Sequence, residues 1–216
     1  TGVSASFANS RDQNVNLSTA YNNAYRAAPI IEAVDANGKY GNTSLYQNVG
    51  NAVLDIKNNN DLSVDNRIQT SGFIEVKPNS FFSYKSSLGG DLMFGNQNIF
   101  NDKFENDQTT FILPGGNQRS PFTNLNSNFN NSFHWVFDNI ITLEKSYDKN
   151  NFKLLLGTTA EQFSHRNLSG YRRDVPAASN LWYLNTGNAN TSTNGGSGDK
   201  WARNSYLSRF NFNHAD

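Results

Sequence analysis

The stretch SFHWVFDNIITLEKSYDKNNFKLLLGTTAEQF, residues 132–163, decides the fold. In its first half apolar side chains such as Phe133 and Trp135 alternate with polar ones such as His134 and Glu144. The second half repeats the pattern with Phe, Leu and Ala against Lys, Thr and Glu. Because successive side chains of a β-strand point to opposite faces, this period of two predicts two strands, each with an apolar and a polar face.

The same alternation recurs through the chain and predicts four more strands. They cover residues 1–8, 67–77, 81–94 and 201–213. Residues 78–80 and 148–150 carry the Pro, Asn and Asp that tight turns prefer, so we expect short hairpin connections there. The sequence therefore predicts an all-β protein of about six antiparallel strands.

The other three connections are long, at about residues 9–66, 95–131 and 164–200. Long and short connections alternate, which in an up-and-down sheet places all long loops at one end and all tight turns at the other. This asymmetry, with strands of about ten residues, is typical of a transmembrane β-barrel of the outer-membrane type. Six strands are too few to close such a barrel, since the smallest have about eight. We therefore expect the chain, which starts at Thr1 within a strand, to be a segment of a larger barrel.

The amino-acid composition excludes several classes of function. The 216 residues contain 18 basic and 18 acidic side chains, so the chain lacks the basic excess of a nucleic-acid-binding protein. It has no cysteine, which excludes disulfides and thiolate chemistry, and no apolar run long enough for a transmembrane helix. Charged residues make up only 17%, yet the mean hydropathy is −0.65, because 36 residues are asparagine. Such a chain fits a β-protein that meets something other than water on one face.

The alternation assigns side chains to the two faces of the predicted barrel wall. We expect the apolar face to contact membrane lipid and the polar face to line a hydrated lumen. The predicted lumen-facing residues are Arg67, Lys85, Asp138, Glu144, Lys153 and Arg209. Aromatic girdles are expected at the turn ends (Phe81, Phe82, Tyr147, Phe152 and Phe212) and toward the loop ends (Phe94, Phe133, Trp135 and Tyr206). A soluble β-sandwich with packed aromatic faces is the alternative that the strands alone leave open.

Four segments resemble one protein family. They are YRAAPIIEAVDANGKYGN (25–42), DNIITLEKSYDKNNFKLLLGTTAEQF (138–163), NLWYLNTGNA (180–189) and SGDKWARNSYLSRFNFNHAD (197–216). Each is similar to a segment of the SusC/RagA-type TonB-dependent transporters of Bacteroidota, and the four occur in the order expected for that family. Together they comprise 74 of the 216 residues and extend from residue 25 to residue 216.

The resemblance implies a barrel of about 22 strands with a plugged lumen in the bacterial outer membrane. It also implies nutrient import, energised by the TonB complex and assisted by a SusD-like surface lipoprotein that covers the extracellular face. The plug domain and the TonB box of that family are not found in these residues, so energy coupling is expected to involve parts that this sequence does not contain.

Enzymatic chemistry is not expected. Asp138 and Glu144 share a face, but six residues of strand separate them by about 20 Å, too far for a pair of glycosidase carboxylates. The histidines His134, His165 and His214 are scattered and lack the spacing of metal ligands. We expect neither a metal nor a cofactor.

Aromatic residues in the long loops are the candidate contacts with a ligand or with the lid lipoprotein. They are Tyr21, Tyr25, Tyr40, Tyr46, Trp182 and Tyr183. Aromatic faces stack on sugar rings and peptide groups, and the many Asn amides both donate and accept hydrogen bonds. This combination favours an oligosaccharide or peptide substrate. The alternative is that these rings only pack the loops. Residues 12–25 are expected to form a short loop helix capped by Asp12.

Two other functions remain open at this point. One is a secreted or surface glycan-binding β-sandwich, and the other is a structural adhesin barrel without transport. A native protein that is soluble without detergent would exclude the barrel, and an adhesin would show no uptake defect when its gene is deleted.

Overall fold

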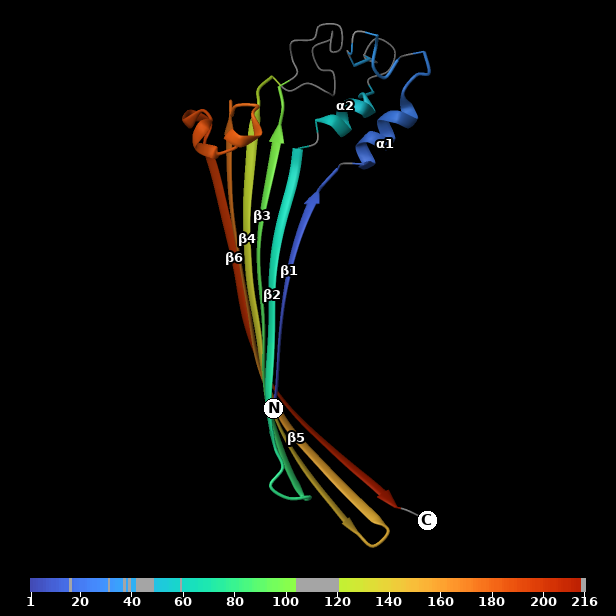
Figure 1. The fold of residues 1–216 in the computed structure, drawn as a ribbon, viewed down its shortest axis with the longest axis vertical. Coiled ribbons are helices and arrows are strands. Elements are labelled where there is room, and N and C mark those ends of the chain that lie inside the picture. The colour runs from blue at the N-terminus through green and yellow to red at the C-terminus, as the bar shows by residue number, and fades with distance from the viewer. Residues whose placement is uncertain are drawn as a thin grey trace.

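The computed structural model of the chain describes residues 1–15, 17–30, 32–36, 38, 40–41, 49–58, 60–103 and 121–214. One antiparallel sheet dominates it, with its strands in sequence order (Figure 1). The strands are β1 (Gly2–Gln13), β2 (Asn60–Val76), β3 (Phe82–Asn101), β4 (Asn124–Tyr147), β5 (Asn150–Arg173) and β6 (Thr193–His214). The sheet is open, with β1 and β6 at its two edges. The predicted all-β, up-and-down arrangement of a barrel segment is confirmed.

The two ends of the sheet differ as predicted. At one end lie the two tight turns, which join β2 to β3 and β4 to β5. In the first turn Asn79 Oδ1 accepts hydrogen bonds from the backbone N–H groups of Phe81 and Phe82, at 3.0 and 2.9 Å. In the second, Asp148 has a positive φ of 51°. All the helices of the described residues gather at the other end (Figure 1).

The strands are longer than the sequence predicted. They extend to 17–24 residues in β2–β6, so residues 95–101, 124–131, 164–173 and 193–200 of the predicted loops are strand. Asparagine is uncommon in strands, and for this reason these stretches read as loop. Here the asparagine amides bond across the sheet instead. Asn101 Nδ2 donates to Asn124 Oδ1 at 2.8 Å, and Asn167 Nδ2 donates to Asn130 Oδ1 at 2.7 Å.

The longer strands also move one of the predicted aromatic girdles. Phe133, Trp135 and Tyr206 were expected toward the loop ends, but they lie near the middle of β4 and in the turn-side half of β6. At the turn side Phe152 and Phe212 do lie together, with ring centroids 5.1 Å apart. Phe94, the fourth residue of that predicted girdle, does lie in the loop-side half of β3. The predicted loop-side girdle is therefore displaced toward the middle of the sheet at three of its four residues.

The register divides the sheet into two faces of opposite character. The polar face carries Arg67, Asp91, His134, Glu161 and Arg203, which lie on the same side of consecutive strands. The opposite face has an uncharged, mostly apolar band, called here the apolar belt. It comprises the side chains of that face within residues 3–7 of β1, 68–76 of β2, 82–94 of β3, 133–143 of β4, 152–160 of β5 and 202–212 of β6.

Two helices pack together above β1 and β2. Helix α1 (Leu17–Arg26) buries Ala20 and Asn23, and Asn23 Nδ2 donates to Asp55 Oδ2 of α2 (Ala52–Lys57) at 2.7 Å. The predicted loop helix therefore exists, but its predicted cap is wrong. Asp12 is the penultimate residue of β1, where it pairs with Ser63. The longer strand delays the start of the helix by several residues.

The connection from β5 to β6 folds onto the sheet through three short 3₁₀ turns, η1 (Ser179–Leu181), η2 (Leu184–Thr186) and η3 (Ala189–Thr191). Trp182 and Leu184 from this connection pack against a small buried cluster of Phe100, Leu125 and Val175. None of the helices in the described part of the chain has both the length and the apolar character needed to cross a membrane.

Candidate functional site

The polar face carries a connected group of charged side chains near the middle of the strands. Arg67 of β2 forms an ion pair with Asp91 of β3, and its Nε donates to Asp91 Oδ1 at 2.9 Å. Gln69 Nε2 donates to Asp91 Oδ2 at 3.0 Å. One carboxylate of β3 thus holds two side chains of β2.

A second carboxylate continues the group across the next strands. Glu161 of β5 forms an ion pair with Arg203 of β6. The Oε2 atom of Glu161 also lies 3.4 Å from Nε2 of His134 in β4. The Glu161 side chain is 10% exposed, whereas the Arg203 side chain is 66% exposed. His134 stands directly opposite Asp91 in the register, so the two halves meet at this histidine. We call the five residues Arg67, Asp91, His134, Glu161 and Arg203 the charged row.

Aromatic rings lie beside the charged row. The rings of Phe163 and Trp201 stack with centroids 5.9 Å apart, and the His134 ring lies 5.9 Å from that of Trp201. On the other side, a hollow of about 430 Å³ is lined by the hydroxyls of Ser4, Ser6 and Ser71 together with Gln69, Asp91 and His134. The row and its surroundings therefore offer charged, amide, hydroxyl and aromatic groups to a ligand at this face.

All six residues predicted to face the lumen lie on the polar face. They make intramolecular contacts there: Arg67 with Asp91, Lys85 over the Phe73 ring at 4.5 Å, Asp138 accepting from Thr159 Oγ1 at 2.6 Å, Glu144 with Lys153 at 2.9 Å, and Arg209 Nε donating to Asn211 Oδ1 at 3.1 Å. Of the six, only Arg67 belongs to the charged row. That this face lines a lumen stays a prediction.

The sequence prediction missed the other four members of the charged row. Their polar alternation was visible, but what makes them a group is the register of four neighbouring strands. Asp91 and His134 are 43 positions apart in sequence and directly opposite in the sheet. A residue pattern along one strand carries no information on that alignment.

The loop aromatic residues do not form a single site. Trp182 stacks on Phe100 with ring centroids 4.5 Å apart, which is the loop-packing role considered as the alternative. Tyr183 beside it is 66% exposed. Tyr21 and Tyr25 of α1 are 72% and 83% exposed. Helix α1 lies at the opposite side of the loop end from the connection between β5 and β6 (Figure 1).

The two remaining loop tyrosines have different outcomes. Tyr40 bridges to Val34 and has Lys57 Nζ 5.8 Å from its ring centroid, so it helps to hold the loop that leads to α2. Tyr46 lies outside the described residues. Of the five candidates that the structure describes, the two tyrosines of α1 and Tyr183 are therefore the most accessible to a ligand or partner.

The histidines each have a local polar neighbour. His165 Nδ1 lies 3.3 Å from Asp199 Oδ1, and His214 Nδ1 lies 2.9 Å from Asn150 Oδ1. Over the described ranges, no group of three or more His, Asp or Glu side chains has an arrangement that could hold a metal ion.

Comparison with known proteins supplies the fold but no family assignment. The sequence matches no protein-family model and no curated protein. Among solved structures, the chain is similar to the RagAB peptide importer in its closed-closed state, with a TM-score of 0.60 and 16% sequence identity over 71% of this chain. It is similar at the same identity to the RagAB peptide transporter (TM-score 0.61, 72% of this chain) and to the importer in its open-open state (TM-score 0.60, 71%).

The chain spans 16% of the length of each of these neighbours. At this identity the likeness shows a shared β fold alone. The six strands therefore have the arrangement found in a part of these larger β structures.

Proposed function

We propose that these residues form part of the wall and outer loops of a TonB-dependent importer in a bacterial outer membrane, for peptides or oligosaccharides. The observation that carries the proposal is the two-faced sheet. The apolar belt of β4 spans residues 133–143, which matches the 9–11 residues of a strand that crosses a membrane. The opposite face carries the charged row.

The proposed mechanism follows from the two faces. The apolar belt contacts lipid, and the polar face lines a water-filled path that a plug gates. Movement of the plug, driven by the TonB complex, is assigned to parts of the protein beyond these residues. We also propose that this segment catalyses no reaction, since its proposed role is to line the water-filled path and to hold the substrate.

A peptide is the preferred substrate class. The charged row presents carboxylates and guanidinium groups side by side, and these can exchange partners with the charged termini and side chains of a peptide. A neutral oligosaccharide would use only the hydroxyls, amides and aromatic rings near the row. The likeness to a peptide importer supports the same preference.

The face assignment is tested with brominated lipids, which quench tryptophan fluorescence by contact. Trp135 lies in the apolar belt, and Trp201 lies on the polar face. In the whole native polypeptide reconstituted in vesicles, Trp135→Phe is expected to remove part of the lipid-quenchable fluorescence. Trp201→Phe is the matched control and should leave that component unchanged. Equal losses from both variants would refute the barrel-wall assignment.

The transport assignment is tested by uptake. Deletion of the gene should reduce uptake of labelled oligopeptides by intact cells, and the gene carried on a plasmid should restore it. Normal uptake of both peptides and oligosaccharides after deletion would favour a structural adhesin instead.

The lid partner is proposed to contact α1. Tyr21 and Tyr25 are one helical turn apart and both exposed, so they form one aromatic surface at the loop end. We expect Tyr21→Ala with Tyr25→Ala to reduce the amount of surface lipoprotein that copurifies with the native protein. Asn22→Ala, also exposed on α1, serves as the control. Unchanged copurification would remove α1 from the contact.

A further inference from the structure

Charged side chains are sorted between the two faces of the sheet. Every carboxylate in the six strands lies on the polar face: Asp12, Asp61, Asp65, Glu75, Asp91, Asp138, Glu144, Glu161 and Asp199. The cations are divided. The face of the apolar belt carries Arg11, Lys145, Arg166, Arg172 and Lys200, all outside the belt itself. That face is therefore purely cationic beyond its uncharged band.

The two sets of cations also differ in their contacts. Arg67, Lys153 and Arg203 on the polar face are each in an ion pair. On the belt face, none of the five cations forms an ion pair or a side-chain hydrogen bond with any other residue that the structure describes. These charges lack an internal counterion, which fits an external anionic partner.

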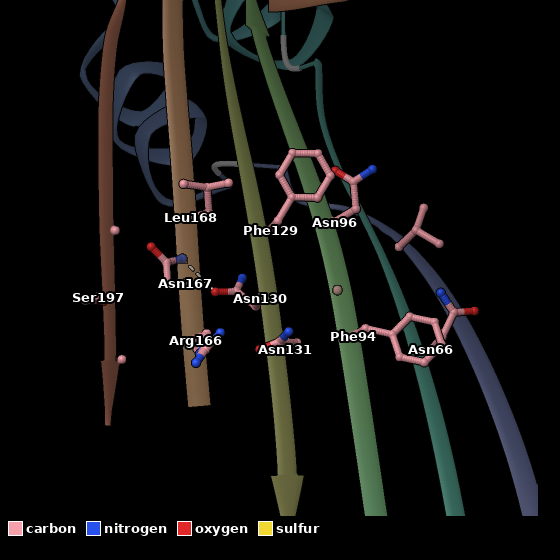
Figure 2. Close-up of a pocket in the computed structure, with 14 residues that line it drawn as sticks. Asn66, Phe94, Asn96, Phe129, Asn130, Asn131, Arg166, Asn167, Leu168 and Ser197 are labelled. Atoms are coloured by element: carbon pink, nitrogen blue, oxygen red, sulfur yellow. Dashed lines mark hydrogen bonds between the residues drawn. The ribbon is translucent and has the colours of Figure 1, made fainter. Parts of the chain in front are cut away.

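One of these cations lines a hollow on the belt face. The hollow, called here the Arg166 hollow, has a volume of about 940 Å³ and lies on the loop side of the belt across β2–β6 (Figure 2). Asn66, Asn96 and Asn131 supply amides, while Phe94, Phe129 and Leu168 supply apolar surface. On β6 the wall comprises Gly196, Ser197 and Gly198, and the two glycines have no side chains to fill the space.

A second cation stands close to the hollow. Gly198 pairs with Arg166 in the register, and Lys200 is two residues further along β6 on the same face. Diagonal neighbours of this kind lie roughly 7–8 Å apart, within reach of one doubly anionic group. The combination is two cations and several amides at the edge of an apolar surface.

We propose that the Arg166 hollow binds the phosphate-bearing headgroup of an anionic lipid from the leaflet on the loop side, with its acyl chains along the apolar belt. Guanidinium and ammonium groups form charge-assisted bonds to phosphate, and asparagine amides can donate to headgroup hydroxyls. The apolar belt beside the hollow selects a lipid over a soluble anion. The proposal rests on the lipid-facing assignment of the belt made under Proposed function.

The test measures lipid selectivity. The whole native polypeptide is reconstituted in phosphatidylcholine nanodiscs that contain a minor fraction of phosphatidylglycerol, and the lipids retained after detergent extraction are counted by native mass spectrometry. We expect phosphatidylglycerol to be enriched over phosphatidylcholine. Arg166→Gln or Lys200→Gln should each lower the enrichment by about fivefold, and the double variant by about 30-fold, because each cation near an anionic lipid contributes similarly.

The matched control is Arg209→Gln, which removes the same charge from β6 but on the polar face, and it should leave the enrichment unchanged. All three substituted side chains are exposed. An enrichment that the double variant retains overturns the proposal. Binding of inorganic phosphate alone that is as strong as binding of phosphatidylglycerol also overturns the proposal, since the site would then recognise a free anion.

The outcome is separable from that of the proposed function. If Trp135 is quenched by brominated lipid and phosphatidylglycerol is not enriched, only the lipid site fails. If Trp135 is not quenched either, the barrel-wall assignment fails with it.

Discussion

At the scale of single residues, Leu155 and Leu156 have the same side chain and adjacent positions but opposite surroundings. Leu156 lies in the apolar belt beside Ile141, while Leu155 lies on the polar face beside Thr142 and Arg209. If the belt meets lipid, a charge should be tolerated at one position and not at the other. Whether a position is odd or even along the strand thus determines the surroundings of its side chain, even where the residue type is the same.

We therefore expect Leu156→Arg to lower the free energy of unfolding by about 2–4 kcal/mol, the usual cost of a cation in the middle of the lipid-facing band. Leu155→Arg should cost less than about 1 kcal/mol, because the polar face can hydrate the guanidinium. Urea titration of the protein folded in lipid vesicles measures both. Equal costs would contradict the assignment of the faces.

Trp182 packs against the sheet and does not project from the loop toward solvent. Its ring stacks on Phe100, and its indole N–H is buried without a hydrogen-bond partner among the described residues. Trp182→Ala should destabilise the connection between β5 and β6 by about 2 kcal/mol, through loss of this contact.

Hydrogen exchange of residues 174–192 measures that loss. Tyr183→Ala is the control, because the Tyr183 side chain is mostly exposed and its removal should leave exchange unchanged. A Trp182 variant with normal loop protection but weaker ligand binding would instead support the ligand role.

At the scale of elements, the β4–β5 hairpin has the longest run of paired residues in the sheet. Its two strands pair from Asn124 with Arg173 to Tyr147 with Asn150, and a two-residue turn joins them. The turn requires Asp148 to adopt a positive φ of 51°, a region that Asp and Asn tolerate and β-branched residues do not.

Asp148→Val should therefore destabilise the protein by about 1–2 kcal/mol, the cost of the left-handed conformation for an ordinary residue. Asp148→Gly should be neutral or stabilising. Lys149→Val, in the same turn but without a positive φ, is the control. The midpoint of urea unfolding reports all three, and equal effects of the two valines would contradict the turn geometry.

The strand alternation and both tight turns were predictable from sequence, because the period of two and the turn residues are local properties. The strand ends were not, since Asn96, Asn98 and Asn126–Asn130 read as loop when taken singly. Their stability in the sheet comes from partners on the next strand, such as Ser127 Oγ with Asn98 at 2.7 Å. The charged row escaped prediction for the same reason, because it exists only through the alignment of distant strands.

At the scale of the whole molecule, the strands are about twice as long as the belt. The belt covers residues 133–143 of β4, whereas that strand covers Asn124–Tyr147. The sheet should therefore continue out of the hydrocarbon layer on the loop side, first at the level of the hydrated lipid headgroups and then in water. Polar and cationic residues on the belt face of that part, such as Asn131 and Arg166, agree with this arrangement.

This arrangement predicts that the accessibility of side chains to lipid and water changes along β5. Nitroxide labels on single introduced cysteines should alternate between lipid and water accessibility over residues 152–160. Beyond residue 164 the labels should be accessible to water on both faces. The 216 residues contain no native cysteine, so none of them adds background labelling. Alternation that persists to residue 172 would contradict the proposed height of the membrane boundary.

The open edges of the sheet have a consequence for how the chain folds. Within the described part of the chain, β1 and β6 each leave one row of backbone donors and acceptors without a partner strand, and such rows recruit further strands. The β2–β3 and β4–β5 hairpins close loops of a few residues, so their closure entropy is small. Assembly should begin at these two hairpins, which then dock through the longer connections, and growth continues at the edges. Further strands can thus pair at both edges of the sheet, and β1 and β6 determine where neighbouring strands join.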